Sequence, residues 1–500
     1  MSDTYTIIAK DYNSPFIRNL IWTACYKHWK EYDLPTTKLG IISRNNTIDY
    51  IHIPENWRKT GEIFFKKVKK DISFFENIID ENISYGQEMN DYTEKIFNSD
   101  LKAQSNKDLL SSYKKFLKMQ SREYAIGILL PLVDLGGLLF VESHLRTYLK
   151  KHTPKDFDKN FDIFTFPSHP SFQEEQELSL LTIYKKIKVN LKNKSNQEIL
   201  SMIKEHKEIY KLFQAHCKKY AWVYYVYQGP AYEEINFTEF LQDYANKELD
   251  PENEIKNIVN KRKSIEKSKE ALLKQLKPDE LTKKLLLLAG KLVYTKPGRK
   301  DLQSKSYYHI EKLQRELGNR LNLSLEEIRA TPIEDLEAYL DGNPVEKEKI
   351  KDRIKLHVCI TDNNEKTIVL TGKEAEEFID THYQQEKEKQ VTHSAILKGS
   401  CACQGYAKGP AKIVNKPDDM AKMNYGDILI SAATTPAIVP AMKKAAAFVT
   451  NEGGLTCHAA IVSREMNKPC VVGVSTATEL IKDDDEVEVN ATQGIVRILK

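Results

Sequence analysis

The fold of the C-terminal part of this 500-residue chain is decided by one stretch, Asn451–Glu465, which reads NEGGLTCHAAIVSRE. An apolar run at residues 445–450 precedes it, and a second apolar run, Cys470–Val474, follows it. The two runs predict short buried strands, and the apolar residues after His458 predict a helix. We therefore expect a strand, a glycine loop, a helix and a second strand, with His458 at the start of the helix.

The predicted position of His458 suggests phosphoryl chemistry. The start of a helix carries unpaired N–H groups and a partial positive charge, so it favours phosphate and other anions. An imidazole there is well placed to carry a phosphoryl group. Two alternatives stay open: His458 could be an ordinary helix-cap histidine, and Cys457 could be a nucleophilic thiol activated by the same helix start. A catalytic cysteine normally needs a separate base, which the sequence does not identify, so we interpret Cys457 as a small packing residue.

The C-terminal stretch resembles the swivelling phosphohistidine domain of the PEP-utilising enzymes, the family of phosphoenolpyruvate synthase, pyruvate phosphate dikinase and the rifampicin phosphotransferases. The segments that carry the resemblance are Gly405–Gly409, Gly426–Ile430, Thr434–Pro436, Val439–Met442, Thr456–His458, Asp485–Val489 and Gly494–Val496. The resemblance implies that His458 is the phosphoryl carrier and that Thr456 lines the phosphate site. It also implies a phosphate-binding loop, made up of Gly453, Gly454, Thr456 and Cys457.

Composition sets broad limits on the protein. Lys and Arg number 75 against 71 Asp and Glu, and this balance is too even to indicate a nucleic-acid partner. Seven cysteines, an odd number, favour a reducing cytoplasm over a disulfide framework, and Cys401-Ala402-Cys403 does not predict a metal site. The N-terminus does not resemble a signal peptide. The apolar run Ala125–Val141 contains Pro131 and Asp134, so it predicts a broken pair of buried helices and not a membrane span.

Periodicity predicts a multidomain α+β protein, with a largely helical N-terminal and middle region and a C-terminal swivelling β/β/α phosphohistidine domain. The predicted parts are a small mixed α/β segment (1–60), a helical, acceptor-binding region (61–345), a β-hairpin with a helix (346–383), a charged linker (384–398) and the swivelling domain (399–500). A swivelling carrier needs such a hinge, although the charged residues could equally form a helix end.

The helical region shows a weaker resemblance to the rifampicin phosphotransferase-like proteins, around Lys219–Trp222, Gly229-Pro230 and Asn319–Glu327. In that family, the corresponding region holds the phosphate acceptor. The aromatic residues Trp222, Tyr224 and Tyr227 could therefore form part of an acceptor pocket. The alternative, that they belong to an ordinary core, stays open. His144, His216 and His309 are candidate acids or bases, each with a structural role as the alternative.

Two parts that the family uses have no counterpart in the sequence. An ATP-grasp domain charges the histidine from ATP, and a TIM barrel handles pyruvate in the synthases. The chain ends at Lys500, directly after the swivelling domain, so we do not expect it to make phosphoenolpyruvate alone. No glycine-rich phosphate loop is evident, so we expect no cofactor on this chain and place ATP and Mg²⁺ on a separate ATP-grasp partner.

The resulting expectation is a split dikinase-type phosphotransferase. The partner phosphorylates His458, and the swivelling domain passes the phosphate to a small-molecule acceptor in the helical region. The alternative is a non-catalytic regulatory or binding protein that has kept the mobile domain. A third possibility is that phosphoenolpyruvate charges His458 through another protein.

Overall fold

A computed structural model describes residues 4–12, 14–35, 37–45, 47–132, 140–187, 191–361, 366–383, 396–454 and 457–499. The chain divides into two units, of which the first combines Met1–Phe140 with His309–Lys500 and the second is Val141–Tyr308. None of the helices in the described ranges combines the length and the apolar character that a membrane crossing requires.

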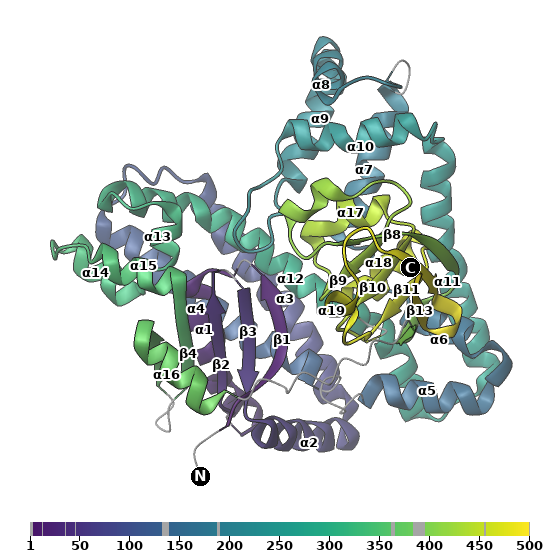
Figure 1. The fold of residues 1–500 in the computed structure, drawn as a ribbon, viewed down its shortest axis with the longest axis horizontal. Helices are drawn as coiled ribbons and strands as arrows, with labels where there is room; N and C mark the ends of the chain where they lie inside the picture. The colour runs from purple at the N-terminus through teal and green to yellow at the C-terminus, as the bar shows by residue number, and fades with distance from the viewer. Residues whose placement is uncertain are drawn as a thin grey trace. The chain divides into compact units, whose positions relative to one another are not determined.

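Strands from two distant parts of the sequence form one antiparallel sheet in the first unit (Figure 1). Its order is β1-β3-β2-β4-β5. The strands are β1 (Thr6–Tyr12), β2 (Leu39–Arg44), β3 (Thr47–His52), β4 (Leu356–Thr361) and β5 (Thr367–Thr371). The predicted hairpin is confirmed, because β4 and β5 pair along their whole length. Its predicted turn, Asp362–Asn364, lies outside the described residues.

The two faces of this sheet bury different partners. On one face, Ile42, Ile51 and Val358 pack against α16 (Gly372–His382) through Phe378. On the other face, α1 (Phe16–Ala24) lies over β2 and β4. Side chains of adjacent strand residues point to opposite faces, so both faces of β2 and β4 are apolar. This is why these strands read as continuous apolar runs.

The predicted division of the first 383 residues therefore differs from the structure. The segment 1–60 and the hairpin segment 346–383 were expected to be separate parts, yet their strands share one sheet. The helical segment 61–345 is also not one part, because 141–308 forms a unit of its own. Strand pairing between residues more than 300 positions apart, such as Gly40 and Ile360, leaves no local pattern in the sequence, which is the physical reason for the difference.

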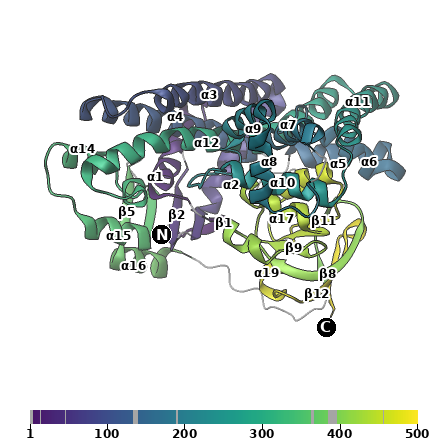
Figure 2. The same ribbon diagram turned by 90° about the horizontal axis from the view of Figure 1, so that it is seen from above.

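Helices surround this sheet in the first unit. They are the 3₁₀ helix η1 (Cys25–Tyr32), α2 (Pro54–Lys70), α3 (Ile72–Asn98), α4 (Asn106–Leu132), α13 (Leu325–Arg329), α14 (Ile333–Leu340) and α15 (Lys347–Lys355). Figure 2 shows α3 and α4 side by side. α4 continues through Pro131 to its end at Leu132, and the following residues 133–139 lie outside the described ranges. A capping box formed by Ser324 and Glu327 begins α13.

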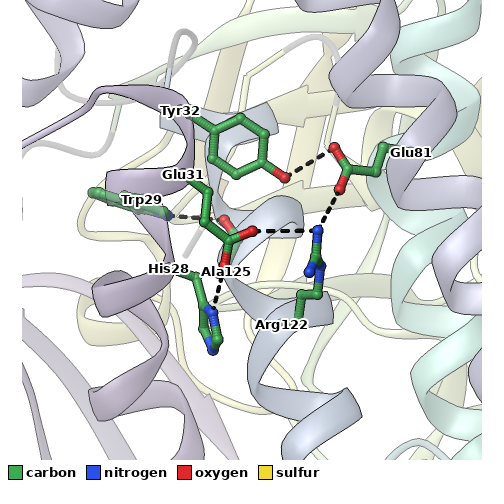
Figure 3. A network of polar contacts seen from close by, with 7 residues as sticks. All are labelled: His28, Trp29, Glu31, Tyr32, Glu81, Arg122 and Ala125. Carbon is green, nitrogen blue, oxygen red and sulfur yellow. Dashed lines mark hydrogen bonds and ion pairs between the residues drawn. The ribbon is translucent and has the colours of Figure 1, made fainter.

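A polar network ties η1 to α3 and α4 (Figure 3). The Arg122 guanidinium lies 3.2 Å from a Glu31 carboxylate oxygen and 3.3 Å from a Glu81 oxygen. The Tyr32 hydroxyl donates to the other Glu81 oxygen at 2.9 Å, and burial beside this carboxylate raises the pKa of Tyr32. Trp29 adds a bond from its indole N–H to the Ala125 carbonyl at 2.9 Å. These bonds fix η1 against both long helices.

The second unit is helical. Its helices are α5 (Phe140–His152), the 3₁₀ helix η2 (Pro154–Asp156), α6 (Phe157–Thr165), α7 (Phe172–Ile187), α8 (Asn196–Glu205), α9 (Lys207–Tyr220), α10 (Glu234–Asn246), α11 (Pro251–Leu276) and the first part of α12 (Glu280–Leu321). A break separates α11 from α12. Lys277 adopts a left-handed conformation, and Pro278 follows it. A proline disfavours the helical conformation in the residue before it, so α11 ends here.

The last part of the chain forms an eight-stranded sheet in the order β6-β13-β12-β8-β9-β10-β11-β7. The strands are β6 (Ile396–Lys398), β7 (Ser400–Cys403), β8 (Tyr406–Ile413), β9 (Ile428–Ser431), β10 (Ala447–Thr450), β11 (Cys470–Val472), β12 (Glu486–Asn490) and β13 (Ile495–Leu499). Strands β8, β9, β10 and β11 are parallel. Their connections contain η3 (Pro417–Lys422), η4 (Pro436–Ile438), α17 (Val439–Lys444) and α18 (His458–Met466), and α19 (Ala477–Leu480) follows β11. The strand-and-helix character agrees with the predicted fold class.

This sheet curls until its two outer strands meet. β6 and β7 stand at opposite ends of the strand order, yet only Gly399 separates them in the sequence. A single residue spans at most about 3.6 Å, so the two ends of the sheet lie together. Because β6 pairs with β13, residues 396–398 belong to the sheet and not to the predicted linker 384–398. The rest of that linker, 384–395, lies outside the described residues.

The buried residue His357 on β4 makes the stability of the first unit sensitive to acid. Its Nδ1 lies 2.6 Å from the Arg353 carbonyl oxygen and its Nε2 lies 3.0 Å from the Asn19 amide nitrogen. A neutral ring with its hydrogen on Nδ1 satisfies both partners, and burial lowers the pKa of His357 to about 4.

We expect the stability from neutral His357 to be complete above pH 6.5 and to be lost as the pH falls through 4. A shift of this size corresponds to about 3 kcal/mol in the free energy of unfolding. Thermal unfolding measured from pH 7.5 to 4 should show a steeper loss for the wild type than for His357→Gln. The exposed His206→Gln variant should keep the wild-type slope, and equal slopes for all three proteins would refute the assignment.

Candidate functional site

The strand–loop–helix–strand unit expected around His458 is present, as β10, the loop 451–457, α18 and β11. β10 lies between β9 and β11 and is parallel to both, and all four of its residues are buried. The predicted helix start is confirmed: Cys457 is the N-cap residue and His458 is the first residue of α18. The site therefore follows the carboxyl end of a parallel strand, the edge at which open α/β sheets bind ligands.

Backbone hydrogen bonds hold the first half of the loop against the residues after β9. Thr450 and Ser431, the last residues of β10 and β9, are paired. Beyond them, the Asn451 N–H donates to the Ser431 carbonyl and the Glu452 N–H donates to the Ala432 carbonyl, both at 3.0 Å. These bonds keep the two chain segments together beyond the sheet, which brings the residues that follow Ala432 close to α18.

Gly453 is required by the shape of the loop. Its φ of +108° is a conformation that residues with a side chain rarely adopt. A β-carbon at this position would also lie 2.7 Å from the Cys457 sulfur. The Gly454 carbonyl accepts a hydrogen bond from the Cys457 N–H at 3.0 Å, which closes the turn into the helix. The fourth predicted phosphate-loop residue, Thr456, lies outside the described residues.

The structure adds a residue to which the sequence assigned no role. Thr434 follows β9, and its hydroxyl oxygen lies 2.8 Å from Nδ1 of His458. Thr434 is buried, whereas His458 is half-buried. The Thr434-Thr435-Pro436 sequence belongs to the family resemblance, and its place after a strand parallel to β10 is the signal that could have identified it. Parallel neighbours end at the same edge of a sheet, so the residues after them meet.

The hydrogen bond to Thr434 selects the reactive nitrogen of His458. A neutral imidazole has one nitrogen with a hydrogen and one with a lone pair. When Nδ1 carries the hydrogen, it donates to the Thr434 oxygen and leaves the lone pair on Nε2. Nε2 is then the nitrogen that is able to attack phosphorus. The N–H groups of Ala459 and Ala460, in the first turn of α18, have no partner within the helix and supply positive potential at this point.

Three cysteines lie near this site. Burial raises the pKa of the Cys470 thiol, and the nearby thiols of Cys457 and Cys403 add to the effect. A buried thiol with a raised pKa is a poor nucleophile, so Cys470 is a packing residue. Arg464 is buried in the last turn of α18. In the part of the chain that the structure describes, no group of three or more His, Cys, Asp or Glu side chains is arranged to hold a metal ion.

The aromatic residues predicted to line an acceptor pocket lie in the second unit. Trp222, Tyr224 and Tyr227 belong to a series of turns after α9, and each is nearly fully buried. The Tyr224 hydroxyl donates to Gln176 at 2.9 Å and its ring stacks on Tyr232 with a centroid distance of 4.3 Å. These contacts favour the core interpretation over an open pocket.

The three histidines considered as acids or bases make structural contacts. Nδ1 of His216 lies 2.8 Å from the Ser179 hydroxyl, and burial lowers the pKa of His216 to about 3. His309 is buried with its Nδ1 3.2 Å from the Thr93 hydroxyl oxygen. Nε2 of His144 lies 3.3 Å from the Thr282 hydroxyl oxygen. A histidine whose pKa is near 3 is neutral at physiological pH, so His216 is a poor proton donor.

Comparison with known proteins assigns the C-terminal region to a class. Residues 423–494 match the family model of the PEP-utilising enzyme mobile domain. This region of the chain therefore belongs to the PEP-utilising enzyme family, as its sequence predicted.

Individual relatives agree with this class. The chain is 49% identical over 115 residues to the probable phosphoenolpyruvate synthase of Archaeoglobus fulgidus, an alignment that covers 22% of this chain and 15% of the relative. It is 46% identical over 112 residues to the phosphoenolpyruvate synthase of Pyrococcus furiosus, covering 22% and 14%. The Escherichia coli phosphoenolpyruvate synthase is 33% identical over 181 residues, covering 36% and 22%. The similarity thus spans less than a quarter of each relative.

We expect Thr434→Val to slow phosphorylation of His458 by up to about ten-fold, because one hydrogen bond of about 1 kcal/mol no longer favours the Nδ1–H form. Thr434→Ser keeps the hydroxyl and should react at the wild-type rate. The rate of incorporation of acid-labile phosphate measures the effect, and ¹⁵N chemical shifts of the His458 ring report the form directly. A Val variant with the wild-type rate and the wild-type shifts would show that Thr434 has no positioning role.

A second prediction concerns the loop. Gly453→Ala should lower the free energy of unfolding by about 1–3 kcal/mol, because the new side chain both meets Cys457 and adopts a positive φ. Gly426→Ala is the matched control, since Gly426 also has a positive φ but a β-carbon there has no neighbour within 4 Å. Thermal unfolding of both variants separates the two effects. If Gly453→Ala costs no more than Gly426→Ala, the close contact with Cys457 is unimportant.

Proposed function

We propose that this chain is the phosphoryl carrier and acceptor-binding subunit of a split dikinase-type phosphotransferase. The observation that carries the proposal is the arrangement of His458: it begins α18 at the carboxyl end of β10, and Thr434 holds its Nδ1. The match of this region to the mobile domain of the PEP-utilising enzymes supports the same function.

The first half of the reaction is phosphorylation of His458. The lone pair of Nε2 attacks a phosphorus atom of the donor, the bond from phosphorus to the donor oxygen breaks, and the positive charge on the phosphorylated ring is shared with Nδ1–H. The Thr434 oxygen accepts from this Nδ1–H and stabilises the charge. The N–H groups of the first turn of α18 face the phosphoryl oxygens. Little else than positioning and charge stabilisation is needed for such a transfer.

The donor in this proposal is ATP, bound with Mg²⁺ by a separate ATP-grasp protein. The relatives described above are phosphoenolpyruvate synthases, which makes phosphoenolpyruvate the second candidate donor. The acceptor is a small molecule bound by the helical unit 141–308. The mobile domain carries the phosphoryl group from one site to the other.

The experiment that tests the carrier assignment follows labelled phosphate. The purified chain is incubated with an ATP-grasp protein of the same organism and [β-³²P]ATP, and in parallel with [³²P]phosphoenolpyruvate. We expect acid-labile label on the wild type and on the control variant His206→Ala, which changes an exposed histidine. His458→Ala should take up no label.

Each other outcome has a definite meaning. Label on His458→Ala would contradict the carrier role. If only phosphoenolpyruvate labels the chain, phosphoenolpyruvate and not ATP is the donor. An unlabelled wild type in both arms would favour a regulatory or binding protein that has kept the mobile domain.

A further inference from the structure

One face of α12 in the second unit gathers ionisable side chains that the carrier step does not use. Tyr294, Gly298, Asp301 and Ser304 follow one another at intervals of three and four residues, so they share a face of the helix. The Ser304 hydroxyl donates to the Trp222 carbonyl at 3.0 Å, which packs this face against the turns after α9. Asp301 lies one turn before Ser304, at the edge of that contact.

Asp301 is an unusual carboxylate for a helix. The residue is only 8% exposed, and among the described residues its carboxylate has neither a hydrogen-bond partner nor an ion pair. Burial raises the pKa of Asp301 to about 7, and the charge of the neighbouring Lys300 opposes this shift. A buried carboxylate without a partner costs free energy, so a purely structural site would not favour it. A carboxyl group that titrates near neutral pH is suited to proton transfer.

The face of α12 that carries Asp301 has an open position. Gly298 lies one turn before Asp301, and a β-carbon there would meet no atom within 4 Å. Two turns before Asp301, the half-buried Tyr294 ring lies against the ring of His169 with a centroid distance of 5.2 Å. His169 is exposed, so this side of the cluster is open to solvent. The cluster thus runs from the exposed His169, past the half-buried Tyr294, to a buried carboxylate.

The charges that face the cluster come from two further elements. Burial raises the pKa of Tyr294, and the negative charges of Asp301 and of Glu175 on α7 raise this pKa further. Lys300 is the cation next to Asp301 on α12, and the exposed His169 belongs to the loop between α6 and α7. Asp301 and Tyr294 are therefore close enough to influence one another, which places them in one site.

We propose that Asp301 is the catalytic base of the phosphate-acceptor site, and that the acceptor is a small molecule that presents a hydroxyl group to Asp301 over Gly298, with Tyr294 and His169 beside its apolar part. This inference rests on the proposed carrier function and names the acceptor site for it. It replaces Trp222, Tyr224 and Tyr227, which are packed in the core, as the predicted acceptor-binding residues.

The acceptor, His458 and Asp301 together account for every bond and every proton in the transfer step. The hydroxyl oxygen of the acceptor forms a bond to phosphorus, and the bond from phosphorus to Nε2 of His458 breaks. The electron pair of that bond returns to Nε2, which leaves the ring neutral with its hydrogen on Nδ1. The hydroxyl proton goes to the Asp301 carboxylate and from there to solvent. The products are the phosphate ester, neutral His458 and protonated Asp301, with the net charge unchanged.

The test charges His458 without any partner and uses water as the acceptor. Potassium phosphoramidate phosphorylates the full-length chain, and the decay of phosphohistidine is followed by ³¹P NMR between pH 5.5 and 8.5. The wild type should show a rate that rises with pH with a midpoint near 7, where Asp301 loses its proton. Asp301→Asn should lack this rise and decay about ten-fold or more slowly above pH 7.5, as expected when a general base is removed. The exposed Asp156→Asn variant should behave as the wild type.

A second variant tests the same site in case Asp301→Asn fails to fold. Gly298→Leu keeps the carboxylate but fills the open position one turn before it, so it should slow the decay while thermal unfolding stays close to that of the wild type. Equal decay rates and equal pH profiles for Asp301→Asn and the wild type would overturn the inference. If no phosphohistidine forms at His458 even in the wild type, the carrier function itself fails, and this result is separate from the role of Asp301.

Discussion

The hydrogen bond between Thr434 and His458 depends on one constraint, the parallel pairing of β9 with β10. The two strands end level with each other, and the chain beyond β10 continues to bond to the residues beyond β9. Thr434 and His458 are 24 residues apart in sequence, and they meet because both follow the same edge of the sheet. The glycine turn then directs the chain into α18 at the one place where the imidazole reaches Thr434. A change in strand register would separate them, since side chains alternate along a strand.

The rest of the C-terminal region supports this edge. Its sheet curls so that β6 and β7 meet at Gly399, and the enclosed core holds β10 between two parallel neighbours. A buried, fully paired central strand is a rigid base for a loop that carries a reactive group. The domain therefore presents His458 from a fixed frame.

Local patterns were good guides wherever a feature is decided by neighbouring residues. The glycine pair and the apolar residues after His458 predicted the start of α18, and the hairpin of β4 and β5 was predicted from its alternation. The aromatic residues around Trp222 show the limit of such patterns. Aromatic side chains look the same in a sequence whether they line a pocket or fill a core, and only their neighbours, such as Gln176 and Tyr232, distinguish the two.

By itself, the sequence predicted the class of the C-terminal region and the helix that begins at His458, because the first rests on a long motif and the second on contacts within a few turns. The tertiary structure decided that strands from residues 6–52 and 356–371 share a sheet, that Thr434 holds Nδ1 of His458, and that Asp301 is buried one turn after an open position on α12. The physical reason is the same in each case. Burial and strand pairing bring together residues that are far apart in the chain, and a local pattern does not record which partner a residue will meet.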